Sequence, residues 1–342
     1  MSASITDPLT PADATRPTLL SELLHNRWLR MAGRRIAWLI GSLWILITAG
    51  FFMIHLVPGD PVRQALGRNA PAAMVEERRH QLGLDQSTFT QYLHYLANLP
   101  RGHMGTSLFT GQPVADAIGS QIKVSLSLAL WSFLVVVVVA VPVGVVAAAL
   151  TRGGRRRRVE LGFTSTGIIV ATLPSFILAE VLTYVFSVHL GWFPIAGRSG
   201  PASYILPVIS LAAGPAAILT RVVRVEMLAV LDRDYIRTAR SKRLPLWRIY
   251  LREALPNALT ATLTVAGLML TGLVAGTVLV ENVFSWPGLG TDMVTSIRQK
   301  DYPLVQGIII VYGTGVVVIN LLVDLVLGAI DPRSTLSSGA SK

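Results

Sequence analysis

Long uncharged apolar stretches constrain this chain more than any other feature of its sequence. Residues 124–150, VSLSLALWSFLVVVVVAVPVGVVAAAL, contain no charged side chain. A helix needs about 20 apolar residues to cross the hydrocarbon core of a bilayer. Six stretches meet this requirement, at about 36–57, 124–150, 161–190, 204–225, 259–281 and 303–330. The sequence therefore predicts an all-α polytopic membrane protein with six transmembrane helices.

The overall composition agrees with a membrane-embedded chain. Charged residues make up 14% of the 342 residues, whereas soluble domains carry about 25%. The net charge of +11 would suit a nucleic-acid partner if the basic residues covered a polar surface. They lie between apolar stretches instead, so we expect a lipid bilayer and no nucleic acid. Cysteine is absent, and His55 with Asp60 provides too few ligands for a metal site, so no metal is expected.

Basic residues in the short loops predict how the chain is oriented, because cytoplasmic loops carry an excess of Lys and Arg. The N-terminal segment holds five arginines, the loop 151–160 holds five and the loop 227–258 holds seven Lys or Arg. The loops 191–203 and 282–302 on the other side hold one and two. Both termini and residues 227–258 are therefore predicted to be cytoplasmic. The extracytoplasmic loop 58–123 is long enough to escape this rule.

The extracytoplasmic loop 58–123 is predicted to form a small helical cap. Pro71–Leu82 and Ser87–Leu99 have helical spacing, and Ser87 suits the N-cap position of the second helix. Polar chain ends are poorly ordered unless they are tied down. We therefore expect a mobile cytoplasmic segment at 1–35, a membrane domain at 36–333 and a C-terminal tail at 334–342.

The basic loop 227–258 interrupts an otherwise apolar chain. Its sequence predicts one short helix at Asp234–Arg243 and another at Pro245–Glu253, because proline cannot continue a helix but suits the first turn of the next one. One interpretation is an amphipathic segment that lies on the membrane surface and binds anionic lipid. The other is a docking helix for a cytoplasmic partner protein.

Two stretches of this loop, TARSKRL and LREALPNAL, resemble the cytoplasmic coupling loop of ABC importer permeases, and most of all the dipeptide/oligopeptide permease family. Further stretches resemble the same family: HLVPGDP at 55–61, RGHMGTSLFTGQPVADAI at 101–118, ENVFSWPGLG at 281–290, DYPLVQG at 301–307 and NLLVDLVLGAIDPR at 320–333. Their order between the predicted helices makes the resemblance specific. The chain departs from the family at Arg243, where glycine is usual, and at His103 and Met104, where an acidic residue and a leucine are more frequent.

The resemblance implies that this chain is one subunit of a larger importer. Members of the family pair with a second homologous permease, two cytoplasmic ATPase subunits and an extracytoplasmic substrate-binding protein. None of the four lysines follows a glycine, so the chain has no GxxxxGK[ST] phosphate loop. ATP and Mg²⁺ would be bound by the partner subunits. The chain itself would be a non-catalytic permease subunit in the inner membrane of a prokaryote.

The coupling loop would dock in a groove of the ATPase and convert ATPase closure into helix motion. The docking residues that we assign are Tyr235, Thr238, Ala239, Arg240, Lys242 and Leu244. Among them, Ala239 would allow close approach, while Arg240 and Lys242 would pair with carboxylates of the partner.

Polar residues inside predicted membrane helices are the candidates for the translocation pathway. Glu180 lies mid-helix and must be paired, protonated or wetted. In a polar cavity it would suit the terminal amine of a peptide. Asn320 and Asp324 share one helical face, and for both we favour hydrogen bonding between helices within the permease pair over substrate contact.

Other functions were weighed against this one. Relatives of the same architecture carry nickel chelates, glutathione or other small solutes, so the di- or oligopeptide cargo has alternatives. A stand-alone secondary transporter usually contains two matching halves, and this chain shows no such repeat. The GRSG stretch at 197–200 fits the GxSG pattern of rhomboid-type proteases, but the last histidine, His189, precedes Ser199. We reject the protease on that order.

Overall fold

The computed structural model describes residues 27–56, 59–67, 69–154 and 156–330. Across these ranges the chain forms helices, joined by turns and one isolated bridge between Thr106 and Pro113. The predicted tail and residues 1–26 of the predicted N-terminal segment lie outside the described residues. Helix α2 (Arg27–His55) begins ahead of the predicted boundary at residue 36. It crosses the division between two compact units, residues 1–45 and 46–342.

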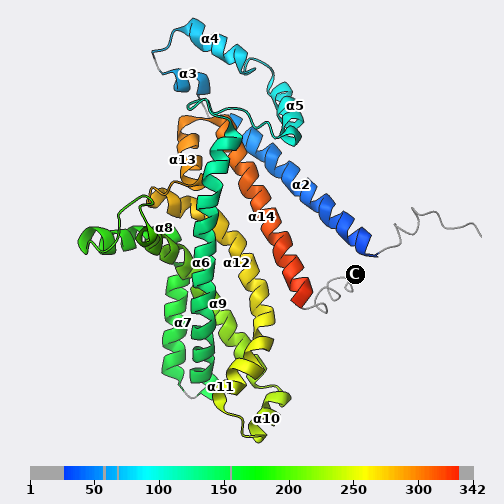
Figure 1. Ribbon diagram of the computed structural model, residues 1–342, viewed down its shortest axis with the longest axis vertical. Coiled ribbons are helices and arrows are strands. Elements are labelled where there is room, and N and C mark those ends of the chain that lie inside the picture. Colours follow the sequence, from blue (N-terminus) through cyan, green and yellow to red (C-terminus); the bar gives the residue numbers. More distant parts are fainter. Residues whose placement is uncertain (1–26, 57–58, 68, 155, 331–342) are drawn as a thin grey trace, which may run out of the picture. The chain divides into compact units, whose positions relative to one another are not determined.

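Four long helices of the second unit are apolar enough to cross a membrane. They are α6 (Val114–Thr151), α9 (Ile205–Leu231), α12 (Leu255–Val283) and α14 (Tyr302–Ile330). Helices α6 and α9 run side by side, and α12 packs against both of them and against α14 (Figure 1). These helices confirm four of the six predicted transmembrane segments.

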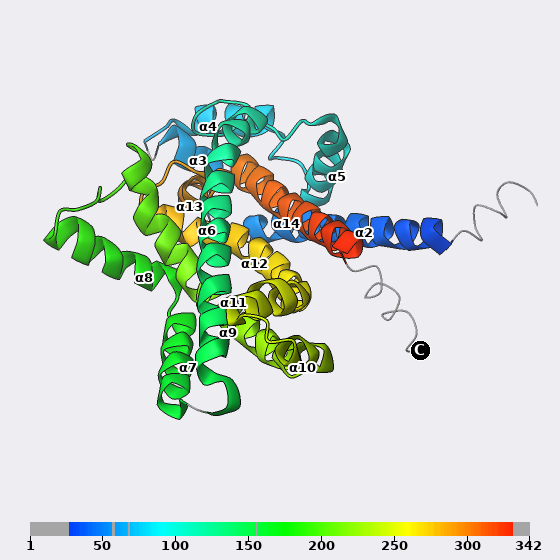
Figure 2. The same cartoon turned by 60° about the horizontal axis from the view of Figure 1, so that its bottom comes forward.

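The predicted transmembrane helix at 161–190 is not continuous. It consists of α7 (Arg157–Thr172) and α8 (Ser175–Leu182), which meet at 95° and are followed by the π-helical turn η3 (Thr183–His189) (Figure 2). Pro174 disfavours a helical conformation at Leu173, whose ψ is 120°. The pair is one broken span or a re-entrant loop. The first predicted segment appears as a shorter apolar stretch, Ala37–Met53, so the count of six and the orientation of the termini stay predictions.

The loop 58–123 contains the helical cap that its sequence predicts. Its helices are α3 (Pro61–Leu66), α4 (Ala72–Gln81), α5 (Thr88–Asn98) and the short η1 (Leu99–Arg101). The Oγ of Ser87 accepts a hydrogen bond from the N–H of Thr90 at 3.2 Å, which confirms the predicted N-cap.

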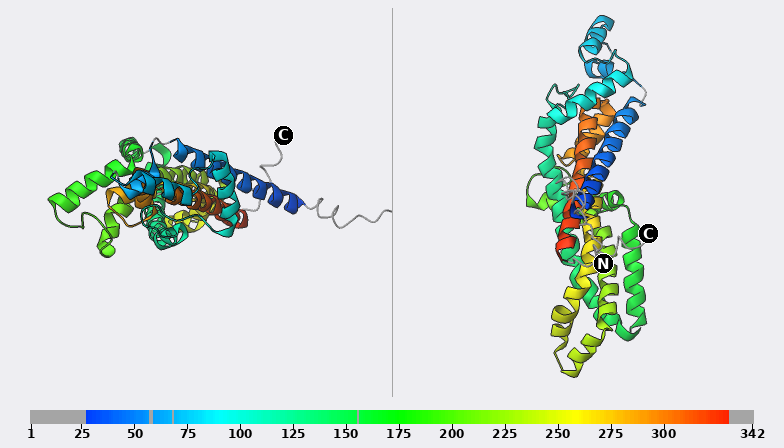
Figure 3. Two further views of the ribbon diagram at one scale, coloured as in Figure 1. Left: turned by 90° about the horizontal axis from the view of Figure 1, so that it is seen from above. Right: turned by 90° about the vertical axis from the view of Figure 1, so that its right-hand side faces the viewer.

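The basic loop between α9 and α12 forms only one separate helix, α10 (Asp234–Ser241) (Figure 3). The second predicted helix, Pro245–Glu253, instead continues into the membrane span. The short helix α11 (Leu246–Arg248) and the π-helical turn η5 (Ile249–Ala254) run directly into α12, so that Leu246–Val283 is one helical stretch. Pro256 does not end it, because the π-helical turn just before it is the kind of local adjustment that satisfies the backbone groups a proline frees in a membrane helix.

The main apolar core joins the transmembrane helices to α10. It contains Leu219, Met227 and Leu231 of α9 and Ile236 of α10, all fully buried. Close helix contact depends on small residues: a Cβ on Gly144 of α6 would lie 2.6 Å from the Cβ of Val223 of α9. The remaining elements are η2 (Arg152–Gly154), η4 (Pro201–Tyr204) and α13 (Leu289–Gln299).

Candidate functional site

Helix α10 presents one apolar face to the core and one polar face to solvent. Ile236 and Ala239, three residues apart on one face, are 0% and 7% exposed. Of the six predicted docking residues, four are exposed: Tyr235, Thr238, Arg240 and Lys242. Ala239 and Leu244 turn inward, and Leu244 packs on the main core. The small side chain of Ala239 thus lets α10 approach its own chain, and the surface available to a partner is tyrosine, threonine and two cations.

The turn after α10 is held in a conformation that favours glycine. Arg243 has φ 54°, in the left-handed region. Its N–H donates to the carbonyl of Arg240 at 2.8 Å, and the N–H of Leu244 donates to the carbonyl of Ala239 at 3.3 Å. Pro245 then follows in an extended conformation. The arginine therefore adopts the tight turn for which the resembled family usually has glycine.

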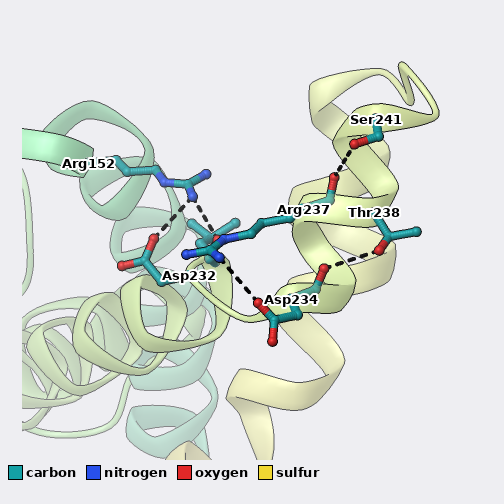
Figure 4. Close-up of polar contacts among 7 residues, drawn as sticks. Arg152, Asp232, Asp234, Arg237, Thr238 and Ser241 are labelled. Atoms are coloured by element: carbon teal, nitrogen blue, oxygen red, sulfur yellow. Dashed lines mark hydrogen bonds and ion pairs between the residues drawn. The ribbon is translucent and has the colours of Figure 1, made fainter.

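Two arginines tie the helix ends next to α10 together. Arg152, just after α6, donates to the carbonyl of Leu231 at 2.7 Å and to Oδ1 of Asp232 at 3.2 Å (Figure 4). Arg224, one-tenth exposed, donates from Nε to Oγ1 of Thr151 at 3.0 Å and from Nη2 to Oε1 of Glu160 at 2.5 Å. These contacts join α6, α7 and α9 where α10 begins, and none of them was predicted from the sequence.

A second polar cluster, also not predicted, holds the connection from α12 to α13. Glu281 is fully buried, and its Oε2 accepts from the N–H of Gly290 at 2.7 Å. Ser125 of α6 accepts from the N–H of Leu289 at 2.9 Å. A Cβ on Gly288 would lie 2.5 Å from Oε2 of Glu281 and 2.7 Å from Oγ of Ser125. The stretch ENVFSWPGLG, with an acidic residue followed by two glycines, was the sequence signal that could have predicted this cluster.

Two aspartates anchor the segments around the helical cap. Asp301, before α14, accepts from the Oγ of Ser107 and from the N–H of Leu108 at 3.2 Å. Asp60 caps α3 and pairs with Arg79 at 2.7 Å. Burial acts to raise the pKa of Asp60, but the N–H of Arg63 and the Arg79 guanidinium outweigh it and lower the pKa below its usual value. Asp60 is thus part of the folded helical cap, while the side chain of His55 lies outside the described residues.

The three predicted pathway residues are not gathered in one site. Glu180 lies on α8 and is exposed in the single chain. Asn320 of α14 accepts a hydrogen bond from Thr271 of α12 at 2.7 Å, a contact between two helices of this chain, so bonding within the permease pair stays a prediction. The side chain of Asp324 lies outside the described residues. A cavity of about 900 Å³ lies between α6 and the start of α9, lined by Trp131, Arg198 and Tyr204 among others, and Glu180 is not among its lining residues.

Comparison with known proteins decides the family. The model of the "Binding-protein-dependent transport system inner membrane component" family matches residues 140–336, and the model of its N-terminal region matches residues 28–129. The chain belongs to the binding-protein-dependent ABC importer permease family. This confirms the resemblance seen in the sequence. A permease of this family is a multi-pass subunit of the bacterial inner membrane, in agreement with the helices described above.

Relatives of this permease include named transport proteins. It is 38% identical to the glutathione transport system permease protein GsiC of Escherichia coli (strain K12) over 299 residues, which cover 87% of this chain and 96% of GsiC. The GsiC protein of Pectobacterium atrosepticum is 37% identical over 299 residues, which cover 87% of this chain and 96% of that protein. A chain of the inward-facing MetNI methionine ABC transporter shares the fold, with a TM-score of 0.51 and 20% identity over 63% of this chain and 96% of that chain.

Proposed function

We propose that this permease forms half of the translocation pathway of an ABC importer for small peptides, glutathione included. It pairs with a second homologous permease, receives cargo from an extracytoplasmic binding protein and is driven by two ATPase subunits. These subunits bind ATP and Mg²⁺, and the permease itself performs no covalent chemistry. The similarity to permeases named for glutathione transport, over 87% of the chain, carries this proposal. Glutathione is itself a tripeptide, so peptide and glutathione cargo share one chemistry.

The exposed face of α10 supports docking of an ATPase. Arg240 and Lys242 are exposed and can pair with carboxylates of a partner. The opposite face, with Ile236 and Ala239, is buried in the main core. A force applied to α10 therefore reaches the transmembrane helices through packed side chains. We propose Tyr235, Thr238, Arg240 and Lys242 as the contact residues, with Ala239 and Leu244 positioning the helix beneath them.

Purification of the intact chain from membranes in mild detergent tests the coupling role. The wild type should co-purify with an ATPase and a second permease. The double variant Arg240→Glu/Lys242→Glu should lose the ATPase and keep the permease. Substitution of Arg78 and Gln81 in α4 by glutamate is a matched control, because both lie on the helical cap far from α10 in the sequence. If no ATPase accompanies the wild type, α10 is a lipid-binding surface and a stand-alone transporter becomes the better proposal.

Uptake by vesicles that contain the complete importer tests the cargo. ATP-dependent uptake of radiolabelled glutathione should be competed by unlabelled tripeptides and not by a nickel chelate. Competition by the nickel chelate alone would assign the permease to the metal-chelate relatives. ATP-dependent uptake of neither probe would exclude both cargoes. Glu180 is our candidate for contact with the cargo amine, so Glu180→Gln should raise the KM for glutathione while the ATPase still co-purifies.

A further inference from the structure

The partly buried ion pair of Arg224 and Glu160, at the α10 end of the helices, has a geometry that suits force transmission. Arg224 lies on α9 two turns before its last residue, Leu231, and α10 begins at Asp234. Its guanidinium contacts two other helices at once, through Thr151 at the end of α6 and Glu160 on α7. The same guanidinium lies 6.0 Å from the ring centroid of Phe163 on α7. One side chain thus joins three transmembrane helices.

A second set of contacts makes this end of the molecule rigid up to α10. Arg152 binds the carbonyl of Leu231 and the carboxylate of Asp232, which are the residues that connect α9 to α10. Within α10, Ile236 and Ala239 are packed in the same core as Met227 and Leu231. Movement of α10 relative to α9 would disturb the packing of these two buried side chains. Helix α7 packs along α9, but none of its residues is buried, so polar contacts add to its connection with α9.

We propose that Arg224 is a positioning residue that makes α7 move with α9 and α10 as one body when the ATPases close. Closure then shifts α7 up to the bend at Leu173–Pro174, where α8 departs at 95°. Because the Arg224 side chain is only 11% exposed, whereas that of Glu160 is 39% exposed, loss of Glu160 leaves the Arg224 guanidinium poorly solvated and without its charge partner. This inference rests on the proposed function, since it assumes that α10 receives the force.

Distance measurement between α10 and α7 in the assembled importer tests the proposal. The chain contains no cysteine, so spin labels can be attached to cysteines introduced at Ser241 on α10 and Ile169 on α7, both exposed. Accessible cysteines of the partner subunits are replaced. Pulsed electron double resonance then compares the nucleotide-free state with the ATP–vanadate state. In the wild type the distance between the labels should stay constant.

The variants should separate α7 from α10. In Arg224→Met and in Glu160→Ala the distance distribution should shift between the two nucleotide states. Glutathione uptake per ATP hydrolysed should fall roughly tenfold, the effect of a lost coupling free energy of about 1.4 kcal/mol. Arg221→Met is the matched control, because Arg221 is an exposed arginine one turn earlier on α9, and it should behave as the wild type.

Several results would overturn the proposal. A distance that changes with nucleotide in the wild type excludes rigid movement. A constant distance in both variants would show that α7 and α10 move together without the ion pair. If Arg224→Met does not assemble, Glu160→Ala decides, since alanine favours the helix and Glu160 is partly exposed. Failure of the proposed function is distinct from these results, because the ATPase would then be absent from the wild-type complex.

Discussion

At the residue scale, small and polar side chains decide how closely the helices approach. Gly288 and Gly290 leave the space in which the carboxylate of Glu281 accepts a backbone hydrogen bond. Such a buried carboxylate is costly unless it is hydrogen-bonded. Arg224 is another buried polar residue whose partners come from other helices. Substitutions at these positions should therefore act on stability through lost space or lost partners.

Gly288→Ala should destabilise the permease. The added Cβ would meet the buried Glu281 and Ser125 at 2.5 and 2.7 Å, and overpacking of this kind costs about 1–3 kcal/mol. Thermal unfolding in detergent should show a lower Tm. Gly272→Ala is the control, since nothing lies within 4 Å of its added Cβ, and it should be neutral or raise the Tm. Equal effects of the two substitutions would contradict the steric explanation.

Arg243→Gly should stabilise the turn after α10. Arg243 has φ 54°, and a left-handed conformation costs a residue with a side chain about 1–2 kcal/mol. Glycine removes that cost, offset in part by its greater freedom in the unfolded chain. The Tm should rise. Lys242→Gly should lower the Tm, because the φ of Lys242 is −75° and needs no glycine. A higher Tm in both variants would refute the conformational argument.

At the element scale, proline and interhelical hydrogen bonds shape the transmembrane region. Pro174 separates α7 from α8, whereas Pro142 lies within the unbroken α6 and Pro215 within the unbroken α9. A proline in a membrane helix is tolerated where neighbouring groups satisfy the freed backbone. The hydrogen bond from Thr271 to Asn320 links α12 to α14. Its two partners permit a quantitative test.

Thr271→Val should lower the stability of the permease by about 0.6 kcal/mol, the average for such a bond in a membrane protein. The substitution leaves the amide of Asn320 without its partner. Asn320→Leu in the same background should then cost less than it does alone, because no hydrogen bond is left to lose. The Tm values of the wild type, both single variants and the double variant provide the measurement. Strict additivity would show that the contact contributes nothing.

At the scale of the whole molecule, stability should depend on pH through a carboxyl outside the membrane helices. Burial raises the pKa of Asp292 on α13 above its usual value of 3.8. The folded state then binds the proton more tightly than the unfolded chain does. The resulting stability is fully present below the unfolded pKa and is lost as the pH rises through the raised folded pKa.

Asp292→Asn should therefore be more stable than the wild type at neutral pH. Asparagine carries no charge at any pH, so it avoids the cost of burying a carboxylate. The difference in Tm between variant and wild type should shrink as the pH falls through the raised folded pKa of Asp292 toward the pKa of the unfolded chain. A difference that stays constant with pH would assign the effect to packing instead.

The sequence predicted those features that depend on local pattern. Apolar stretches of sufficient length located α6, α9, α12 and α14, and Ser87 marked the start of α5. The order of short motifs indicated the family that the comparisons then confirmed. The motifs also located α10 and four residues that are exposed on it. These features follow from neighbours along the chain, since membrane solvation and capping act over a few turns.

By itself, the sequence predicted a helical membrane permease of this family and located the short helix α10 in its basic loop. Only the tertiary structure decided that Ala239 and Leu244 face inward, that Glu281 holds the turn into α13, and that Arg224 pairs with Glu160. Arg224 and Glu160 are far apart in the chain, and nothing local distinguishes this arginine from its exposed neighbour Arg221. Their roles arise because α7 and α9 pack side by side, so the pairing is a property of the packed fold.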